Sequence, residues 1–165
     1  MLRSLKNIFI TVALYLLMTV TSHAANTGNT MIKTYSTYNY QQTREHLIAA
    51  IESNNLVFFG EFDHAKEAKN AGLTMLPTTV IIFGNPKGGT SLMQAYPDMA
   101  LDLPFRVLIR EESDGRVVVG YHPVEILQTY GPDTAAIQPL KNLEKLVQNA
   151  DTALYIAKED GKAKI

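Results

Sequence analysis

A single α+β domain is the fold class that the sequence predicts, and three observations support it. Two alternating runs, residues 104–110 and 116–122, flank Asp114-Gly115, a dipeptide that is favoured in tight β-hairpins. The run at residues 78–83 is apolar throughout, which is typical of a central strand buried on both faces. Residues 140–158 carry apolar side chains at helical spacing. Two of the predicted strands pair directly as an antiparallel hairpin, and the predicted helices gather near the two ends of the domain. We therefore expect an α+β fold rather than a doubly wound sheet.

The N-terminal part of this domain has the pattern of a strand, a helix and a second strand. Residues 31–37 alternate well enough for the first strand. Asn39 is suited to cap the helix, with Gln42 three residues later in the capping-box arrangement. Residues 56–62 are rich in aromatic and branched side chains and form the second predicted strand. The apolar stripe of the helix between them consists of Tyr40, Leu47, Ile48 and Ile51.

Shorter elements separate the remaining strands. A short helix over residues 65–72 ends at Gly72, since glycine readily adopts the left-handed conformation that terminates helices. Residues 84–90 are dense in Gly and Pro, so we expect a loop there. Ser91 is expected to cap a short helix over residues 92–96. The last predicted elements are a helical turn at 123–131, a linker at 131–139 and an amphipathic C-terminal helix at 140–158.

The first 24 residues have the pattern of a cleaved signal peptide. Arg3 and Lys6 precede an apolar run at residues 8–20, which has about the length of a signal-peptide core. The small residues Ser22 and Ala24 fit the cleavage rule, so we expect cleavage after Ala24. An uncleaved membrane anchor is the alternative, although the run is short for a membrane span. After cleavage, residues 25–30 would be a flexible leader, and the protein would be exported, with the periplasm as the expected compartment.

Composition and charge exclude several classes of function. Removal of residues 1–24 takes away two basic residues and no acidic one, which changes the formal net charge from −1 to −3. This mild and dispersed charge argues against a nucleic-acid partner, because phosphate binding needs a clustered basic surface. The absence of cysteine excludes disulfides, thiolate metal sites and a cysteine nucleophile. We therefore expect no nucleic-acid partner and, after signal cleavage, no membrane partner.

Four blocks of sequence occur in the order found in a known family. They read FDHA, LPTTVIIFGNPKGGT, YPDMALDLPFRVLI and DGRVVVGY, and they lie between about residue 35 and residue 130. With these blocks the chain closely resembles the domain of unknown function 302 family. The resemblance implies a compact domain with a curved, mostly antiparallel sheet packed against helices. It also implies that some members form dimers, and it brings no established activity.

Asp63-His64 stands where the second predicted strand gives way to the short helix. On one interpretation Asp63 caps this helix and His64 is a partly buried histidine bonded to main chain. On the other, strand alternation places His64 on the face of Phe58, Gly60 and Phe62, and the ring points into the space between sheet and helix. A neutral imidazole there could act as a base, a metal ligand or a hydrogen-bond partner of a ligand.

The segment at residues 84–90 is the second candidate for a binding site. Its glycines allow backbone N–H groups to converge, and it leads into a helix N-terminus, two features that favour anions. Lys87 adds a positive charge, and Asn85 could either bind a ligand or turn the chain. The order of residues that defines a nucleotide P-loop is absent. A tight turn without a ligand is the alternative.

Asp102 and the histidines are further candidates for acid–base chemistry and for metal binding. Asp102 lies between two leucines, where a buried carboxylate would have a raised pKa, or it caps a turn before Pro104. The histidines after the signal segment are His46, His64 and His122, and none has the spacing of a local metal motif. A site built from His64, Asp102 and His122 would need long-range convergence, so we predict no metal site.

Together these residues favour an exported domain that binds a small molecule in a pocket centred on His64 and residues 84–90. Two alternatives stay open. One is an acid–base enzyme that uses His64 with Asp102 or Lys87, and the other is an interaction module that forms a homodimer without a chemical site. The sequence identifies neither a cofactor nor a catalytic residue. The candidate ligand-binding residues are His64, Gly84, Asn85, Lys87 and Asp102.

Overall fold

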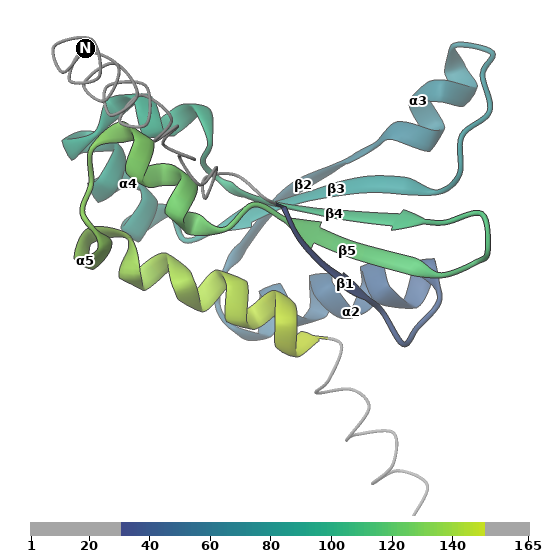
Figure 1. Ribbon diagram of the computed structural model, residues 1–165, viewed down its shortest axis with the longest axis horizontal. Coiled ribbons are helices and arrows are strands. Elements are labelled where there is room, and N and C mark those ends of the chain that lie inside the picture. Colours follow the sequence, from purple (N-terminus) through teal and green to yellow (C-terminus); the bar gives the residue numbers. More distant parts are fainter. Residues whose placement is uncertain (1–30, 151–165) are drawn as a thin grey trace, which may run out of the picture.

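One five-stranded antiparallel sheet organises the part of the chain that the computed structural model describes, residues 31–150 (Figure 1). The strands lie in the order β1-β5-β4-β3-β2, so β1 and β2 are the two edges of the sheet. This arrangement confirms the predicted α+β class and the hairpin at Asp114-Gly115, where Gly115 has a positive φ of 83°. The strands are β1 (Ile32–Tyr35), β2 (Val57–Asp63), β3 (Thr78–Gly84), β4 (Phe105–Glu111) and β5 (Val117–Tyr121).

Helices connect the strands and close the C-terminal part of the domain. The predicted C-terminal helix is confirmed over residues 141–150, while the rest of that range and the predicted signal peptide lie outside the described residues. The predicted linker at 131–139 contains a short helix that Asp133 caps. The other helices are α2 (Tyr40–Ser53), α3 (His64–Asn70), α4 (Pro86–Ala95), α5 (Thr134–Ile137) and the 3-10 helices η1 (Pro97–Leu101), η2 (Val124–Tyr130) and η3 (Gln138–Leu140).

The segment predicted as a loop at residues 84–90 is mostly the first turn of α4, so that expectation was wrong. α4 begins at Pro86, and Asn85 is its N-cap. Proline suits the first helical turn because its missing N–H group would have no helical partner there. Ser91, the expected cap, lies inside α4 and donates a hydrogen bond to a backbone carbonyl one turn earlier at 3.2 Å.

α2 packs on one face of the sheet, across β2, β3 and β4. The side chain of Asn39 accepts a hydrogen bond from the backbone N–H of Gln42 at 2.9 Å, which confirms the predicted cap. The hydroxyl of Tyr40 donates to Thr79 Oγ1 at 2.6 Å and so joins α2 to the interior strand β3. α2 contributes Leu47 and Ile51 to a core whose strand residues on this face include Ile81, Phe83, Val107 and Ile109.

The C-terminal helix covers the same face of the sheet, beside α2 (Figure 1). Gln148 donates a hydrogen bond from Nε2 to the hydroxyl of Tyr121 on β5 at 2.7 Å. Glu144 is buried, and its Oε1 accepts a hydrogen bond from the backbone N–H of Val124 at 2.6 Å. A buried carboxylate needs such partners, and this bond fixes the start of η2 against the C-terminal helix. The helices α2 and 141–150 therefore form one layer, and the sheet forms the other.

An irregularity in β2 changes which side chains face the helices. The pairing of β2 with β3 shifts between Phe58 and Gly60, which leaves Phe59 as the extra residue of a β-bulge. Gly60 has a positive φ of 147°, a conformation that residues with a Cβ rarely adopt. Phe58 pairs with Phe83 on the helix-covered face, whereas Phe62 pairs with Val80 on the opposite face. Regular alternation would place Phe58 and Phe62 on the same face of the sheet, and because of the bulge they lie on opposite faces.

Replacement of Phe83 by alanine should destabilise the domain strongly. Phe83 is fully buried and contacts the ring of Phe105 edge-on, with the ring centroids 5.6 Å apart. We expect the free energy of unfolding, measured by urea denaturation, to fall by about 3–5 kcal/mol. Leu101→Ala is the matched control, because Leu101 is 77% exposed, and its effect should stay within about 0.5 kcal/mol. A Phe83→Ala variant as stable as the control would contradict this core.

The free energy of unfolding should fall at alkaline pH, because the hydroxyl groups of Tyr40 and Tyr121 connect the helices to the sheet and ionise there. Burial raises the pKa of both Tyr40 and Tyr121 above the ordinary value of about 10. Between the unfolded and the folded pKa the unfolded chain binds fewer protons, so the stabilisation present below about pH 10 is lost as pH rises. The test compares urea denaturation at several alkaline pH values with the phenolate absorbance. A Tyr40→Phe, Tyr121→Phe double variant should show a shallower decline, and an unchanged decline would argue against this cause.

Candidate functional site

His64 is the first residue of α3, and its side chain is exposed. Its ring lies edge-on against Phe62, with the ring centroids 4.8 Å apart. Phe62 is on the face of the sheet opposite to α2, so the inward orientation that one interpretation gave His64 is not observed. The exposed side chain also differs from the partly buried histidine of the other interpretation. The bulge in β2 accounts for this difference. Asp63 caps α3 by accepting a hydrogen bond from the backbone N–H of Lys66 at 2.9 Å, as the capping interpretation predicted.

The candidate residues of the 84–90 segment have different surroundings. Gly84 ends β3 and is buried, and Asn85 caps α4. The Asn85 Oδ1 accepts hydrogen bonds from the backbone N–H groups of Lys87 at 3.1 Å and Gly88 at 3.4 Å. The side chain of Lys87 is exposed and, unlike Asn85, does not line the large groove that adjoins this segment. The cap therefore explains Asn85 structurally while leaving its amide nitrogen free to reach a ligand.

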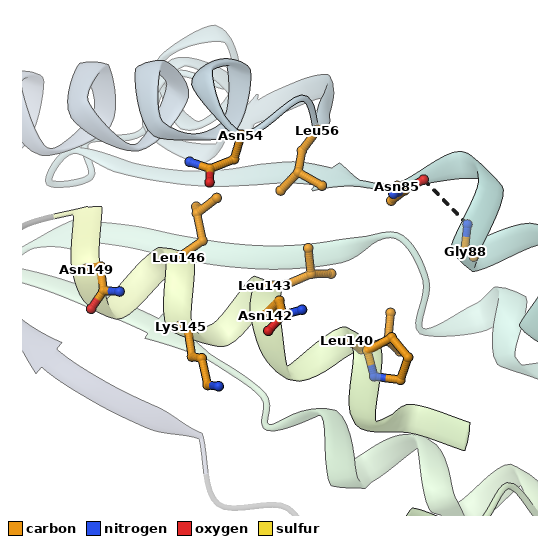
Figure 2. A pocket seen from close by; sticks show the side chains of 12 residues that line it. Asn54, Leu56, Asn85, Gly88, Leu140, Asn142, Leu143, Lys145, Leu146 and Asn149 are labelled. Carbon is orange, nitrogen blue, oxygen red and sulfur yellow. Dashed lines mark hydrogen bonds between the residues drawn. The ribbon is translucent and has the colours of Figure 1, made fainter. Parts of the chain in front are cut away.

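A groove of about 570 Å³ lies between the C-terminal helix and the adjoining ends of α2 and α4 (Figure 2). Asn54 and Leu56, which follow α2, face the C-terminal helix across it, and Asn85 and Gly88 at the start of α4 lie at one end. Amide side chains supply most of its polar groups, so we call it the amide groove. It is lined by Asn54, Leu56, Asn85, Gly88, Gly89, Pro139, Leu140, Asn142, Leu143, Lys145, Leu146 and Asn149.

The polar groups of the amide groove keep hydrogen-bonding capacity available. Asn54 uses its Nδ2 to donate to the carbonyl of Ala50 at 2.9 Å, which leaves its Oδ1 as an acceptor. Asn85 uses its Oδ1 for the cap, which leaves its Nδ2 as a donor. Asn142 and Asn149 make no side-chain hydrogen bond to another described residue. The groove can therefore donate to and accept from a bound molecule along its length.

Lys145 supplies the positive charge of the amide groove. Within residues 31–150 it forms no ion pair, in contrast to Lys141, which pairs with Glu125 and with Glu144. The side chains that line the groove include no carboxylate and no histidine. The four amide side chains and Lys145 are groups suited to holding a polar molecule by hydrogen bonds.

A smaller apolar cavity of about 80 Å³ adjoins the amide groove on the side of α4. The two share Asn85, Gly89, Leu140 and Leu143 in their walls. The rest of the smaller cavity is mostly hydrocarbon, so an apolar group of a ligand held in the groove could enter it. Its remaining lining residues are Phe59, Gly84, Pro86, Met93, Leu103, Pro104 and Phe105.

Asp102 lies outside the amide groove and has structural partners. Its carboxylate accepts hydrogen bonds from Arg106 at 2.7 Å and from the hydroxyl of Tyr130 at 2.6 Å. The hydrogen bond to Asp102 raises the pKa of Tyr130. These contacts connect η1, β4 and η2, so Asp102 has a structural role in holding these elements against one another. No hydrogen bond links His64 to Asp102 or to Lys87 among the described residues, so the pair that the alternative acid–base hypothesis requires is not assembled there.

His46, His64 and His122 lie in three separate places within residues 31–150. His122 lines a small cavity of about 40 Å³ with Asp102 and Arg106, while His64 lies beside Phe62 at the far end of the sheet. His46 packs edge-on against Tyr38 at 4.4 Å between ring centroids. Over residues 31–150, no group of three or more histidine, aspartate and glutamate side chains is placed to hold a metal ion.

The amide groove also contains residues that no sequence pattern indicated as candidates. Asn142, Lys145, Leu146 and Asn149 follow one another at i, i+3, i+4 and i+7 and therefore share one face of the C-terminal helix. This spacing is visible in the sequence as a polar stripe beside the apolar one. A polar stripe on a helix is usually solvent-exposed, so only its juxtaposition with Asn54 and Asn85 identifies it as a groove wall.

Comparisons with known proteins show where this fold occurs. A crystal structure of an uncharacterized conserved DUF302 protein from Bacillus stearothermophilus superposes with a TM-score of 0.63 and covers 74% of this chain and 95% of that one at 15% identity. Proteins from Brucella suis biovar 1 and Brucella abortus biovar 1, both called fluoride-specific ion channel FluC 1, are 40% identical over 87 residues.

Those 87 residues are 53% of this chain but only 34% and 32% of the two Brucella proteins, so the chain spans about a third of the length of these relatives. Over residues 31–150 no helix is long and apolar enough to cross a membrane. Residues 32–150 match the family described as domain of unknown function DUF302. The chain therefore belongs to the DUF302 family.

Proposed function

We propose that this protein is an exported domain that binds a small polar molecule in the amide groove. The observation that carries the proposal is the convergence of Asn54, Asn85 and Lys145 from three separate elements on one cavity. Its volume of about 570 Å³ lies within the range of roughly 300–1,000 Å³ that small-molecule sites occupy. This proposal retains the predicted participation of Asn85, and Gly84 lines only the adjoining 80 Å³ cavity. The predicted centre moves from His64 to the C-terminal helix.

The lining of the groove favours one class of ligand. Amide groups donate and accept hydrogen bonds, so they suit carbonyl, hydroxyl or amide groups of a ligand. The ammonium group of Lys145 suits a single negative charge, such as a carboxylate or a phosphate. The leucines of the floor and the adjoining 80 Å³ cavity suit a short apolar part. We infer a compact organic anion with several hydrogen-bonding groups.

The two Brucella relatives favour a second candidate function. Because proteins named as fluoride-specific ion channels contain a segment similar to this chain, the domain could serve as an accessory to a membrane transport protein. In that case the amide groove would bind a molecule that the transport system handles or senses. Fluoride itself is a test ligand for this candidate, although the groove is much larger than one halide ion.

Loss of the groove's polar groups should weaken ligand binding. Native mass spectrometry of the protein isolated from its own host envelope would identify a co-purifying molecule. Calorimetry with that molecule, and with fluoride, phosphate and citrate as reference anions, would give the affinity. We expect Lys145→Met to weaken binding by about tenfold or more, since a charge-assisted hydrogen bond is lost. Asn149→Ala should weaken binding less.

Two variants serve as controls for this experiment. His64→Ala and Lys87→Met remove exposed side chains that do not line the groove, so binding should change by less than about twofold. The proposal is wrong if no molecule co-purifies and no reference anion binds. It is also wrong if His64→Ala weakens binding as much as Lys145→Met does.

A further inference from the structure

Gly84 is a glycine that neither the backbone conformation nor the packing around it requires. It is the last residue of β3, and its φ lies outside the positive range in which glycine is favoured. A Cβ added to it would lie 3.7 Å from Phe59 Cε2 and 3.7 Å from Pro104 Cβ, which is ordinary van der Waals contact. Glycine in a strand is destabilising relative to alanine. The missing side chain therefore needs another explanation.

The space that an alanine side chain would occupy at this position borders the apolar cavity of about 80 Å³. Gly84, Phe59 and Pro104 all line that cavity. A glycine within a strand often marks a place where a ligand or another backbone approaches closely. Gly84 thus keeps this part of the cavity wide, and a methyl group there would narrow it.

The β-bulge in β2 supplies another wall of the same cavity. Phe59 is the extra residue of the bulge, and its ring lines the cavity although the side chain is 49% exposed. Bulges redirect side chains and are frequent beside functional sites. Met93 of α4 also lines the cavity, and its unbranched thioether side chain can adapt to an incoming group. The cavity is therefore bounded by backbone at Gly84, by a ring at Phe59 and by a flexible side chain at Met93.

The cavity and the amide groove meet at the start of α4, where Asn85 lies at one end of the groove (Figure 2). Asn85 and Leu143 line both spaces. On the groove side Lys145 supplies a positive charge, whereas the lining on the cavity side is mostly hydrocarbon. A molecule held by Lys145 at its charged end can therefore place an apolar end past Leu143 into the cavity.

We propose that Gly84 and Phe59 determine which apolar group a ligand of the amide groove can carry. The inference rests on the proposed function and specifies the ligand as an anion with a short, unbranched apolar end. A water-sized group takes about 30 Å³ of liquid volume, so a cavity of about 80 Å³ has room for two or three carbon atoms. An apolar cavity of about 150 Å³ accommodates a benzene ring, so the smaller cavity excludes aromatic ends.

A series of unbranched monocarboxylates with about two to eight carbon atoms would test this inference. NMR titrations of the isotope-labelled full chain give the affinity for each acid. We expect the affinity of the parent protein to rise with chain length and to stop rising once the cavity is full. Gly84→Ala should move this limit to a shorter chain. It should weaken binding of the acid at the parent's limit by about fourfold or more, the effect of one buried CH₂ group.

Met93→Ala should act in the opposite direction. It removes part of the cavity wall, so the limit should move to a longer chain. A shift in opposite directions by the two variants would assign the selection of chain length to this cavity. A limit that neither variant moves would overturn the inference.

Gly88→Ala is the matched control for Gly84→Ala. Gly88 lines the amide groove but not the cavity, and a Cβ added there has open space around it. The length limit should therefore stay at its parent value. Both variants should keep or raise the melting temperature of the parent, since alanine is favoured over glycine in strands and helices. A lower melting temperature of Gly84→Ala would show that the fold needs this glycine, which would overturn the inference.

The outcomes distinguish this inference from the proposed function. Lys145→Met should weaken binding of all acids in the series by a similar factor, because it acts on their charged end. If no acid binds, although citrate or the co-purified molecule does, this inference fails while the proposed function stands. The same holds if the acids bind and Gly84→Ala has the same length limit as Gly88→Ala. If none of these molecules binds, both proposals are wrong.

Discussion

The packing of α2 and the C-terminal helix side by side on one face of the sheet is the constraint on which the other features depend. Side-chain hydrogen bonds attach these helices to the strands, from Tyr40 to Thr79, from Arg44 to Glu61 and from Gln148 to Tyr121. The buried carboxylate of Glu144 holds η2 against the C-terminal helix. Because both helices occupy the same face, their neighbouring ends enclose the amide groove. On the opposite face of the sheet, Phe62 at the β2 edge stays about half exposed.

The groove illustrates how ordinary elements create a binding surface where they meet. Asn54 lies just after α2, Asn85 caps α4, and Asn142, Lys145 and Asn149 share a face of the last helix. None of these residues is unusual in its own element. Asn85 satisfies the first turn of α4 with its oxygen and presents its nitrogen to the groove, so one side chain has a structural and a binding capacity. This double use is characteristic of sites built at helix ends, where polar side chains are needed for capping in any case.

The elements that local chemistry determines were predictable from the sequence. The Asn39 cap, the Asp114-Gly115 turn and the apolar strand predicted at residues 78–83 each depend on neighbouring residues alone, and each appears in the structure. The strand lies in the interior of the sheet next to the edge strand β2, and Val80 and Ile82 are half-buried, so its predicted burial on both faces was only partly correct. The Asp63 cap belongs to the same class. The start of α4 at Pro86 was missed because two glycines suggest a loop, whereas the cap by Asn85 and the proline at the first turn outweigh their low helix propensity.

The candidate site was predicted less well, because it depends on register and on contacts between distant segments. Alternation along β2 predicts an inward His64 only if the strand is regular. One extra residue at Phe59 places Phe62 on the uncovered face, and the exposed His64 ring packs against Phe62 there. A one-residue shift of this kind leaves no clear mark in composition or periodicity, apart from a glycine at its position. The amide groove joins residues 54, 85 and 149, and no local pattern indicates that such distant segments meet.

The bulge in β2 has a consequence for how the sheet ends. An edge strand exposes unpaired backbone groups, and a long regular edge is a template on which further chains can add and grow into fibrils. Phe59 and Gly60 break the ladder in the middle of β2, so a regular strand of a neighbouring molecule cannot match its hydrogen-bonding pattern along the full length. The opposite edge, β1, spans only the four residues from Ile32 to Tyr35. Both edge strands are therefore poor templates for the addition of further chains, although β2 is rich in phenylalanine.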